Sequence, residues 1–284
     1  MSNIRVWRVQ FSRAAVELGE INYAAAPGTL NELSKQLPGG AYTTFRTYHG
    51  RNVLRLSEQI QRLEETSALI DCLISIDEST FREALRMTLR DYGNRDELRL
   101  RVSLDLEEVP GRMYIAIGPL ETPSAEAYEC GVCVVTGSMR RENPKAKLTG
   151  FISKADVIRQ GLPAGVHEVL LVDTHGRLLE GLSSNFFAVK DGQLKTEGED
   201  ALSGITRGLV LEEALRWGIA VKRSPVTLQE IPSLDEAFIT SASRGVLPVR
   251  KIDEWVIANG VPGPVTRQLS KRYKNRIREE VAEI

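Results

Sequence analysis

A short segment in the second half of the chain has residue types that suit phosphate binding. Gly204, Ile205 and Thr206 stand directly before a stretch whose apolar residues recur at helical spacing. Unpaired N–H groups at the start of a helix bind phosphate, a threonine adds a hydroxyl, and glycine lets the backbone approach closely. An ordinary helix start capped by serine or threonine has the same pattern. The segment is therefore a candidate phosphate site whose role depends on its surroundings.

Three lysines precede this segment: Lys145, Lys147 and Lys154. A lysine amine can attack a carbonyl and can move a proton. Lys145 and Lys147 share one face of an extended segment, so alternation does not separate them. Most lysines are simply exposed. Glu180, which follows Lys147 by 33 residues, could contribute a carboxylate or could be a turn residue.

Five segments occur in a fixed order with these residues. They are QIQRL at 59–63, RRENPKAKLTGF at 140–151, LEGLSSNFF at 179–187, LSGITR at 202–207 and TSASRGVLPV at 240–249. Together they resemble the fold-type IV, or class IV, pyridoxal-phosphate (PLP) enzymes, from about residue 40 to 252. That family includes branched-chain aminotransferases, D-amino-acid aminotransferases and aminodeoxychorismate lyases. The order E-G-x-x-S-N-x-F and then G-I-T-R is specific, whereas any one piece alone is weak.

The resemblance implies pyridoxal 5′-phosphate as the cofactor and Lys147 as the catalytic lysine that forms a Schiff base with it. It places Glu180 opposite the pyridine nitrogen, where a nearby carboxylate favours the protonated ring. A guanidinium suits phosphate geometry, and Arg62 occupies the arginine of the family's Arg-Leu pair. The implied cofactor-binding residues are Arg62, Lys147, Glu180, Ser184, Asn185, Gly204, Ile205, Thr206 and Ser243.

The last of the five segments departs from the family pattern. Related enzymes usually carry threonine where Ala242 stands. Ser241 or Ser243 could supply the missing hydroxyl, and both remain candidates. This departure leaves open which residue donates to the phosphate, but the loop itself still matches the family's last phosphate and substrate loop.

Two strands of the first half carry the candidate substrate residues. Alternation puts Tyr42, Thr44, Arg46 and Tyr48 on one strand face. Arg99 and Arg101 share a face of the second strand, whose other face is apolar and faces the core. Arginine grips carboxylates in a bidentate way, although neighbouring acidic residues could equally pair with both arginines. The predicted substrate-binding residues are Tyr42, Thr44, Arg46, Arg99, Ser241 and Ala242.

Three departures concern the subfamily. The branched-chain group typically has Tyr-x-Arg where 97–99 read Glu-Leu-Arg, and Asn-Tyr where 151–152 read Phe-Ile. The D-amino-acid and lyase groups carry asparagine where Gly150 stands. We expect a transaminase that moves an amino group between an amino acid, or an amine, and a 2-keto acid, branched-chain-aminotransferase-like with atypical substrate motifs. The alternatives are a D-amino-acid aminotransferase, an aminodeoxychorismate lyase and a non-catalytic homologue.

The periodicity predicts an α/β (α+β) protein of two domains, with the cofactor at their junction. A smaller α/β domain covers 1–120, a linker covers 121–128, and the larger cofactor-binding domain covers 129–284. In the first domain we expect strands at 5–11, 41–48, 53–56, 97–104 and 113–118, and helices at 58–70 and 81–92, capped by Ser57 and by a Thr80–Glu83 capping box. In the second we expect strands at 129–136, 169–172, 185–189, 220–222 and 237–240, and helices at 154–160, 207–217 and 264–282.

Composition narrows the class of protein further. The 284 residues have 42% hydrophobic and 26% charged residues and a net charge of −1, an ordinary globular composition. No basic surface field or apolar span points to nucleic acid or a membrane, and no signal peptide is evident, so we expect a cytoplasmic protein. Cys130 and Cys133, three apart on an expected strand, point to opposite faces and predict no metal site. The resemblance implies a homodimer.

Overall fold

The computed structural model describes residues 4–11, 16–23, 27–93 and 97–284. The chain divides into two compact units. Unit 1 consists of Met1–Glu121, Ala146–Asp156 and Glu280–Ile284, and unit 2 of Thr122–Lys145 and Val157–Glu279. The mixed α/β class is confirmed by the presence of a β-sheet in each unit. The domain boundaries expected from the sequence, with the cofactor at their junction, stay a prediction.

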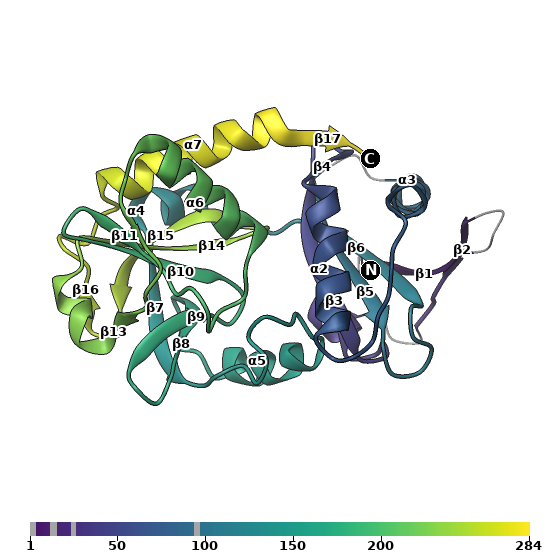
Figure 1. The fold of residues 1–284 in the computed structure, drawn as a ribbon, viewed down its shortest axis with the longest axis horizontal. Coiled ribbons are helices and arrows are strands. Elements are labelled where there is room, and N and C mark those ends of the chain that lie inside the picture. The colour runs from purple at the N-terminus through teal and green to yellow at the C-terminus, as the bar shows by residue number, and fades with distance from the viewer. Residues whose placement is uncertain (1–3, 12–15, 24–26, 94–96) are drawn as a thin grey trace. The chain divides into compact units, whose positions relative to one another are not determined.

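Unit 1 is built on a seven-stranded antiparallel sheet in the described residues, and Figure 1 shows α2 running alongside β3. The sheet order is β17-β4-β3-β5-β6-β1-β2. The strands are β1 (Arg5–Phe11), β2 (Val16–Glu20), β3 (Gly40–Tyr48), β4 (Asn52–Leu54), β5 (Leu98–Asp105), β6 (Met113–Pro119) and β17 (Val281–Glu283).

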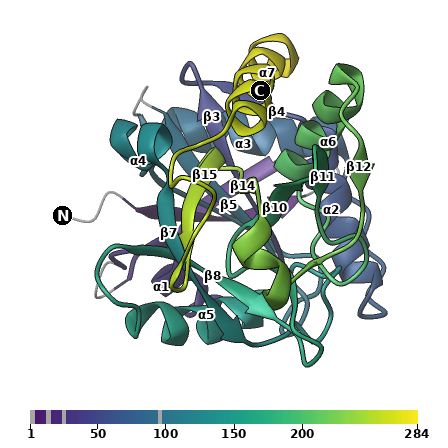
Figure 2. The same ribbon diagram turned by 90° about the vertical axis from the view of Figure 1, so that its left-hand side faces the viewer.

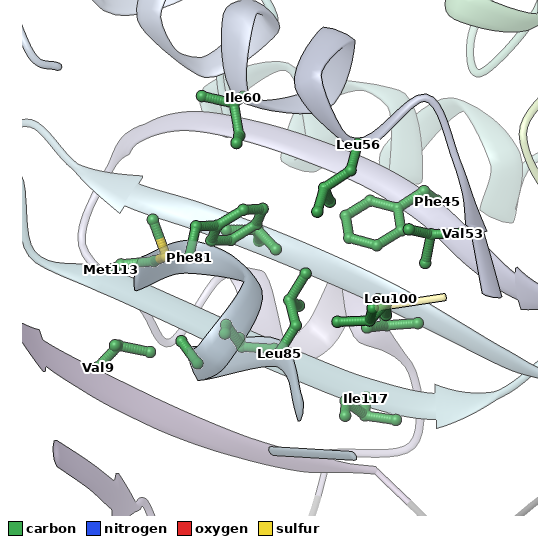
Figure 3. Close-up of a cluster of buried hydrophobic side chains, with 14 of the residues drawn as sticks. Val9, Phe45, Val53, Leu56, Ile60, Phe81, Leu85, Leu100, Met113 and Ile117 are labelled. Atoms are coloured by element: carbon green, nitrogen blue, oxygen red, sulfur yellow. The ribbon is translucent and has the colours of Figure 1, made fainter. Parts of the chain in front are cut away.

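One face of this sheet carries the core of unit 1. Leu98, Leu100, Val102 and Leu104 alternate along β5 and are at most 1% exposed, so the predicted apolar face is confirmed. Helices α2 (Leu56–Ala68) and α3 (Glu78–Tyr92) cover it. Figure 3 shows Leu56 and Ile60 from α2 and Phe81 and Leu85 from α3 directed toward the strand residues.

The opposite face of the sheet carries the candidate substrate residues. The short helix α1 (Leu30–Ser34) packs on this side through Leu30 and Leu33, which contact Val6, Tyr114 and Ala116. Thr29 caps α1 with its hydroxyl, which accepts from the N–H of Glu32 at 3.1 Å. The cap and the apolar contacts fix a helix that is too short to be stable alone.

Unit 2 contains a ten-stranded sheet in the described residues, and Figure 2 shows β7, β15, β14 and β10 side by side. A bridge between Glu180 of β9 and Asn185 of β10 closes six strands, β10-β14-β15-β7-β8-β9, into a ring. The strands are β7 (Val132–Ser138), β8 (Val166–Val172), β9 (Arg177–Gly181), β10 (Asn185–Lys190), β11 (Gln193–Lys195), β12 (Val221–Lys222), β13 (Val226–Thr227), β14 (Glu236–Ser241), β15 (Gly245–Ile252) and β16 (Trp255–Val256).

The helices predicted at 154–160, 207–217 and 264–282 are present with shifted ends, as α5 (Gly150–Gln160), α6 (Ile205–Trp217) and α7 (Pro264–Glu280). Two further helices were not predicted: α4 (Ala125–Cys130), which lies where we expected a linker and the start of a strand, and the 3-10 helix η1 (Leu228–Ser233). Helix α5 starts four residues before the predicted position, which places its first turn three residues after Lys147. None of the helices in the described ranges is long and apolar enough to span a membrane.

Three local predictions are wrong. Arg55, not Ser57, stands at the N-cap of α2, and the Ser57 hydroxyl donates to Glu78 instead. Asp77 caps α3 by accepting from the N–H of Thr80, so that helix begins before the predicted capping box.

The third wrong prediction concerns the two cysteines expected on one strand. Helix α4 ends at Cys130, and β7 begins only at Val132. Gly131 separates the two elements with a φ of +78°, a backbone conformation that glycine adopts easily. Strand alternation therefore does not relate Cys130 to Cys133, and both are free thiols.

Candidate active site

The predicted site residues form two sets, one in each unit. Unit 1 holds Arg62, Lys147 and the strand residues expected to meet substrate. Unit 2 holds Glu180, Ser184, Asn185, the segment 204–206 and the segment 241–243.

In unit 1, the backbone of Lys147 is fixed from two sides. Its N–H donates to the Thr66 hydroxyl of α2 at 3.2 Å, and its carbonyl accepts from the N–H of Tyr42 at 2.9 Å. The following residues continue this contact, since the N–H of Thr149 donates to the Gly40 carbonyl at 2.8 Å. The Lys147 amine lies 5.2 Å from the centre of the Tyr42 ring. The side chain therefore leaves a backbone that is anchored to both a strand and a helix.

The two neighbouring lysines have different environments. The Lys145 amine belongs to unit 2, where it donates to the carbonyl of Gly198 at 3.1 Å and lies 3.5 Å from a carboxylate oxygen of Glu199. Lys154 is exposed on α5. The tertiary structure thus separates Lys145 from Lys147, which strand alternation could not do.

In unit 2, Glu180 forms a buried ion pair. Its carboxylate lies 2.8 Å from the Nε of Arg141, and the two side chains are only 3% and 6% exposed. The second carboxylate oxygen accepts from the N–H of Leu202 at 3.3 Å. The pair thus brings two opposite charges together inside unit 2, where each offsets the cost of burying the other.

The candidate phosphate segment starts helix α6 beside Asn185. Gly204 is the N-cap residue, and no side chain caps the helix there. The Asn185 amide donates to the carbonyl of Leu202 at 2.6 Å. A Cβ atom at Gly204 would lie 2.1 Å from Oδ1 of Asn185, so this position has no room for a side chain. The first N–H groups of a helix have no acceptor within the helix itself, so an uncapped helix start of this kind suits an anion.

The last predicted loop is the turn between β14 and β15. Ser241 pairs with Gly245 across it, and 242–244 form its tip. The Ser241 hydroxyl accepts from the backbone N–H and the Nε of Arg244, at 3.3 and 3.0 Å. Ser243 and Ala242 are partly exposed at the tip. Ser241 and Ser243 therefore both lie in this turn. Which of the two hydroxyls replaces that of the family's threonine stays a prediction.

On the sheet face of unit 1 that carries the candidate substrate residues, β3 and β5 contribute three arginines, and alternation predicted their shared face but not their partners. Arg46 lies directly opposite Arg99 in the β3–β5 register, and Thr44 lies opposite Arg101. Arg46 forms an ion pair with Glu97. Arg101 is only 4% exposed, and it donates to the Leu30 carbonyl and the Ser34 hydroxyl at 2.8 and 2.7 Å. Arg101 thus holds α1 in place, which distinguishes it from Arg99.

Arg62 lies in α2 and is 8% exposed. It belongs to the helix that also supplies Thr66, the acceptor for the backbone of Lys147. These two residues are four apart and share one helix face.

Sequence reasoning missed three charged residues of unit 2: Arg141, Glu168 and Arg244. Arg141 lies in the segment 140–151 but carried no signal beyond its charge. Glu168 precedes the apolar run Val169–Val172, and an isolated carboxylate in a buried strand is a usable signal because such a group needs partners. In the residues that the model describes, no group of three or more His, Cys, Asp or Glu could hold a metal ion.

The chain belongs to the class IV aminotransferase family, whose model matches residues 40–252. A putative branched-chain-amino-acid aminotransferase of Methanocaldococcus jannaschii is 31% identical over 250 residues, which are 83% of this chain and 86% of the relative. A D-alanine aminotransferase of Bacillus licheniformis is 27% identical over 259 residues, 87% and 90% of the two chains.

A solved structure supports the same assignment. The crystal structure of a putative branched-chain amino acid aminotransferase from Thermotoga maritima matches with a TM-score of 0.77 and 28% identity, over 96% of this chain and 95% of that one. This chain is thus a branched-chain-aminotransferase-like enzyme of class IV.

Class IV aminotransferases use PLP, and the residues of both units fit that group chemically. Unit 2 offers an uncapped helix start beside a glycine without side-chain room, which suits a phosphate. It also offers a buried carboxylate, Glu180, with a cationic partner, which suits a protonated ring nitrogen. Unit 1 offers a lysine whose backbone is anchored on both sides.

Proposed function

We propose that this enzyme transfers an amino group between an amino acid and a 2-keto acid, with Lys147 as the residue that binds PLP covalently and moves the substrate proton. The observation that carries the choice of lysine is the anchored backbone of residue 147, whose N–H donates to the Thr66 hydroxyl and whose carbonyl accepts from the N–H of Tyr42. The Lys147 amine lies over the Tyr42 ring, on the strand that carries the candidate substrate residues. The Lys145 amine instead donates to the Gly198 carbonyl and pairs with Glu199 in unit 2.

The other site residues take roles that match their surroundings. PLP, when bound, supplies an electron sink for the negative charge at the substrate Cα. Glu180, which forms a buried ion pair with Arg141, stabilises positive charge on the ring nitrogen. Gly204, Ile205 and Thr206 bind the phosphate through the start of α6, and Arg62, Ser184, Asn185 and Ser243 complete the proposed set. Lys147 would take the proton from the substrate Cα and deliver it to the C4′ carbon of the cofactor, and the half-reaction with the keto acid would run this transfer in reverse.

Arg99 is the proposed cation for a substrate carboxylate, because it is half-buried on β5 opposite Arg46 and a guanidinium binds a carboxylate with two hydrogen bonds. Arg101 on the same strand face donates to three groups of α1, namely the Leu30 carbonyl, the Ser34 hydroxyl and the Asn31 side chain, and its proposed role is structural. Tyr42, Thr44 and Arg46 complete the proposed substrate surface in unit 1, and Ser241 and Ala242 contribute from unit 2.

Substitution of the two arginines is expected to separate substrate binding from stability. Arg101→Met removes three buried hydrogen bonds, at about 1 kcal/mol each, and should lower the free energy of unfolding by about 3 kcal/mol. Arg99→Met should leave stability within about 1 kcal/mol and raise KM for the amino donor about 10-fold or more. Urea unfolding and steady-state kinetics measure the two effects. An unchanged KM in Arg99→Met would contradict the proposed role of Arg99.

A panel of amino donors tests the proposed reaction. With 2-oxoglutarate as acceptor, we expect L-leucine, L-valine and L-isoleucine to react at least about 10-fold faster in kcat/KM than D-alanine, because branched-chain relatives match this chain well. The cofactor absorbance in single half-reactions and the keto-acid product report each donor. A faster reaction with D-alanine would favour the D-amino-acid alternative. Pyruvate released from aminodeoxychorismate without an amino acceptor would favour the lyase, and no reaction with any donor would favour the non-catalytic homologue.

We further propose a homodimer in the cytoplasm. The dimer follows from the resemblance to the family, and light scattering after gel filtration would report a mass near twice 31.5 kDa. Small-molecule amino and keto acids are the expected partners. A net charge of −1 provides no general attraction for nucleic acid.

A further inference from the structure

Glu168 is a buried carboxylate for which the proposed reaction has no role. It lies on β8 and is 2% exposed. One of its oxygens accepts from the hydroxyls of Ser183 and Ser184, at 2.9 and 3.0 Å, and from the Arg244 guanidinium at 3.0 Å. These donors come from two separate turns of unit 2. The carboxylate therefore joins segments that are 61 residues apart in sequence.

The two turns are those that carry proposed ligand groups. The first, Gly181–Ser184, follows Glu180 and ends next to Asn185. The second, Ser241–Gly245, contains Ser243. Arg244 links them directly, because its guanidinium also donates to the Ser183 carbonyl and hydroxyl at 3.0 and 2.8 Å. Its Nε donates to the Ser241 hydroxyl within its own turn.

Both electrostatic interactions and close packing favour this arrangement of Glu168 and its partners. Burial alone would raise the pKa of Glu168, but the charges of Arg244 and Arg159 and the hydrogen bonds from Arg244 and Ser183 outweigh it and lower that pKa. A Cβ atom at Gly181 would lie 2.2 Å from the Ser184 hydroxyl and 2.8 Å from Cγ of Glu168. Two apolar side chains of the same volume as Glu168 and Arg244 could fill this space with equal stability. They would not fix the directions of the Ser183 and Ser184 hydroxyls, as the Glu168 carboxylate does.

We propose that Glu168 is a positioning residue that, through Arg244, holds the Gly181–Ser184 and Ser241–Gly245 turns in the arrangement that binds the cofactor phosphate. This inference rests on the proposed function, because it takes Ser184 and Ser243 as ligand groups. Glu168 itself is not a catalytic residue. It acts through the serines and the arginine that it binds.

A comparable ion pair in the same unit provides a matched control. Glu230 accepts from Lys195 at 2.6 Å and from the N–H and the hydroxyl of Thr227, at 2.9 and 3.1 Å. It thus has a cation, a hydroxyl and a backbone donor, as Glu168 has, but its partners lie outside both turns. Glu230→Gln should lower stability and leave phosphate recognition unchanged.

The experiment measures binding of pyridoxamine 5′-phosphate and of pyridoxamine to the cofactor-free full-length enzyme by calorimetry. Neither probe can form a bond with Lys147, so their affinity ratio reports phosphate recognition alone. Glu168→Gln should reduce this ratio about 10-fold or more, the effect of misplacing one hydrogen bond to a charged group. Arg244→Lys keeps the charge but cannot reach Glu168, Ser183 and Ser241 together, and it should reduce the ratio similarly. Glu230→Gln should keep the wild-type ratio.

The outcomes separate this inference from the proposed function. If the wild-type enzyme binds both probes equally, the proposed phosphate site fails. If the wild-type enzyme prefers the phosphorylated probe and both Glu168→Gln and Arg244→Lys keep that preference, the positioning role is overturned while the proposed function stands. An equal reduction in Glu230→Gln would also overturn it, because general destabilisation would then explain the effect. If Glu168→Gln does not fold, the ratio in Arg244→Lys decides.

Discussion

Replacing Lys147 with alanine is expected to lower kcat for amino transfer by at least about 1,000-fold, because one side chain supplies both covalent cofactor attachment and proton transfer. The backbone contacts of residue 147 with Thr66 and Tyr42 use main-chain atoms, so the variant should fold. Kinetics with the best donor give the loss. Borohydride reduction of the cofactor-loaded enzyme, followed by peptide mass spectrometry, should find the cofactor on Lys147.

Lys145→Ala is the matched control, since it removes the same side chain two residues away. That variant loses a hydrogen bond to Gly198 and an exposed ion pair with Glu199, which together are worth about 1 kcal/mol or less. Its kcat should stay within about threefold of the wild-type value. If the reduced cofactor maps to residue 145, or if Lys147→Ala keeps a tenth of the activity, the assignment of the lysine is wrong.

Replacing Glu180 with glutamine is expected to affect both stability and catalysis. It leaves the Arg141 guanidinium buried without its carboxylate partner, which costs about 3–5 kcal/mol in the free energy of unfolding. Loss of the carboxylate should also lower kcat about 100- to 1,000-fold, the range seen when one electrostatic stabiliser of a reacting group is removed. Urea unfolding of the cofactor-free protein and steady-state kinetics measure the two effects.

A double variant separates these effects of Glu180. Arg141→Met combined with Glu180→Leu replaces the buried pair by apolar side chains, which often restores stability to within about 1 kcal/mol. Catalysis should stay as low as in Glu180→Gln, because the carboxylate is still missing. Recovery of kcat together with stability would show that Glu180 acts only on folding, and its proposed role toward the ring nitrogen would be abandoned.

Much of the fold was predictable because it depends on local periodicity. The apolar face of β5 follows from alternation, and its burial confirmed the prediction. The ends of elements were less predictable. Helix α3 begins at Glu78 because Asp77 accepts from the N–H of Thr80, and a nearby Thr-x-x-Glu pattern offered an equally good local start.

Charged side chains were the least predictable part of the candidate site. Arg99 and Arg101 are equivalent by alternation, yet Arg101 is buried because Leu30, Asn31 and Ser34, about 70 positions earlier, surround its guanidinium. Glu168 likewise takes its partners Ser183 and Arg244 from positions 15 and 76 further along the chain. Periodicity compares residues within one element, and it contains no information on such distant partners.

The sequence by itself determined the family and, by resemblance, the cofactor, because the order of E-G-x-x-S-N-x-F and then G-I-T-R is specific to that family. It also determined which strand faces are apolar, since side chains alternate regardless of tertiary context. Only the tertiary structure decided that Lys145 pairs with Glu199, that Glu180 is buried against Arg141, and that Glu168 joins two turns. These are pairings of charges, and a charge finds its partner through folding of the whole chain because burial makes an unpaired charge unfavourable.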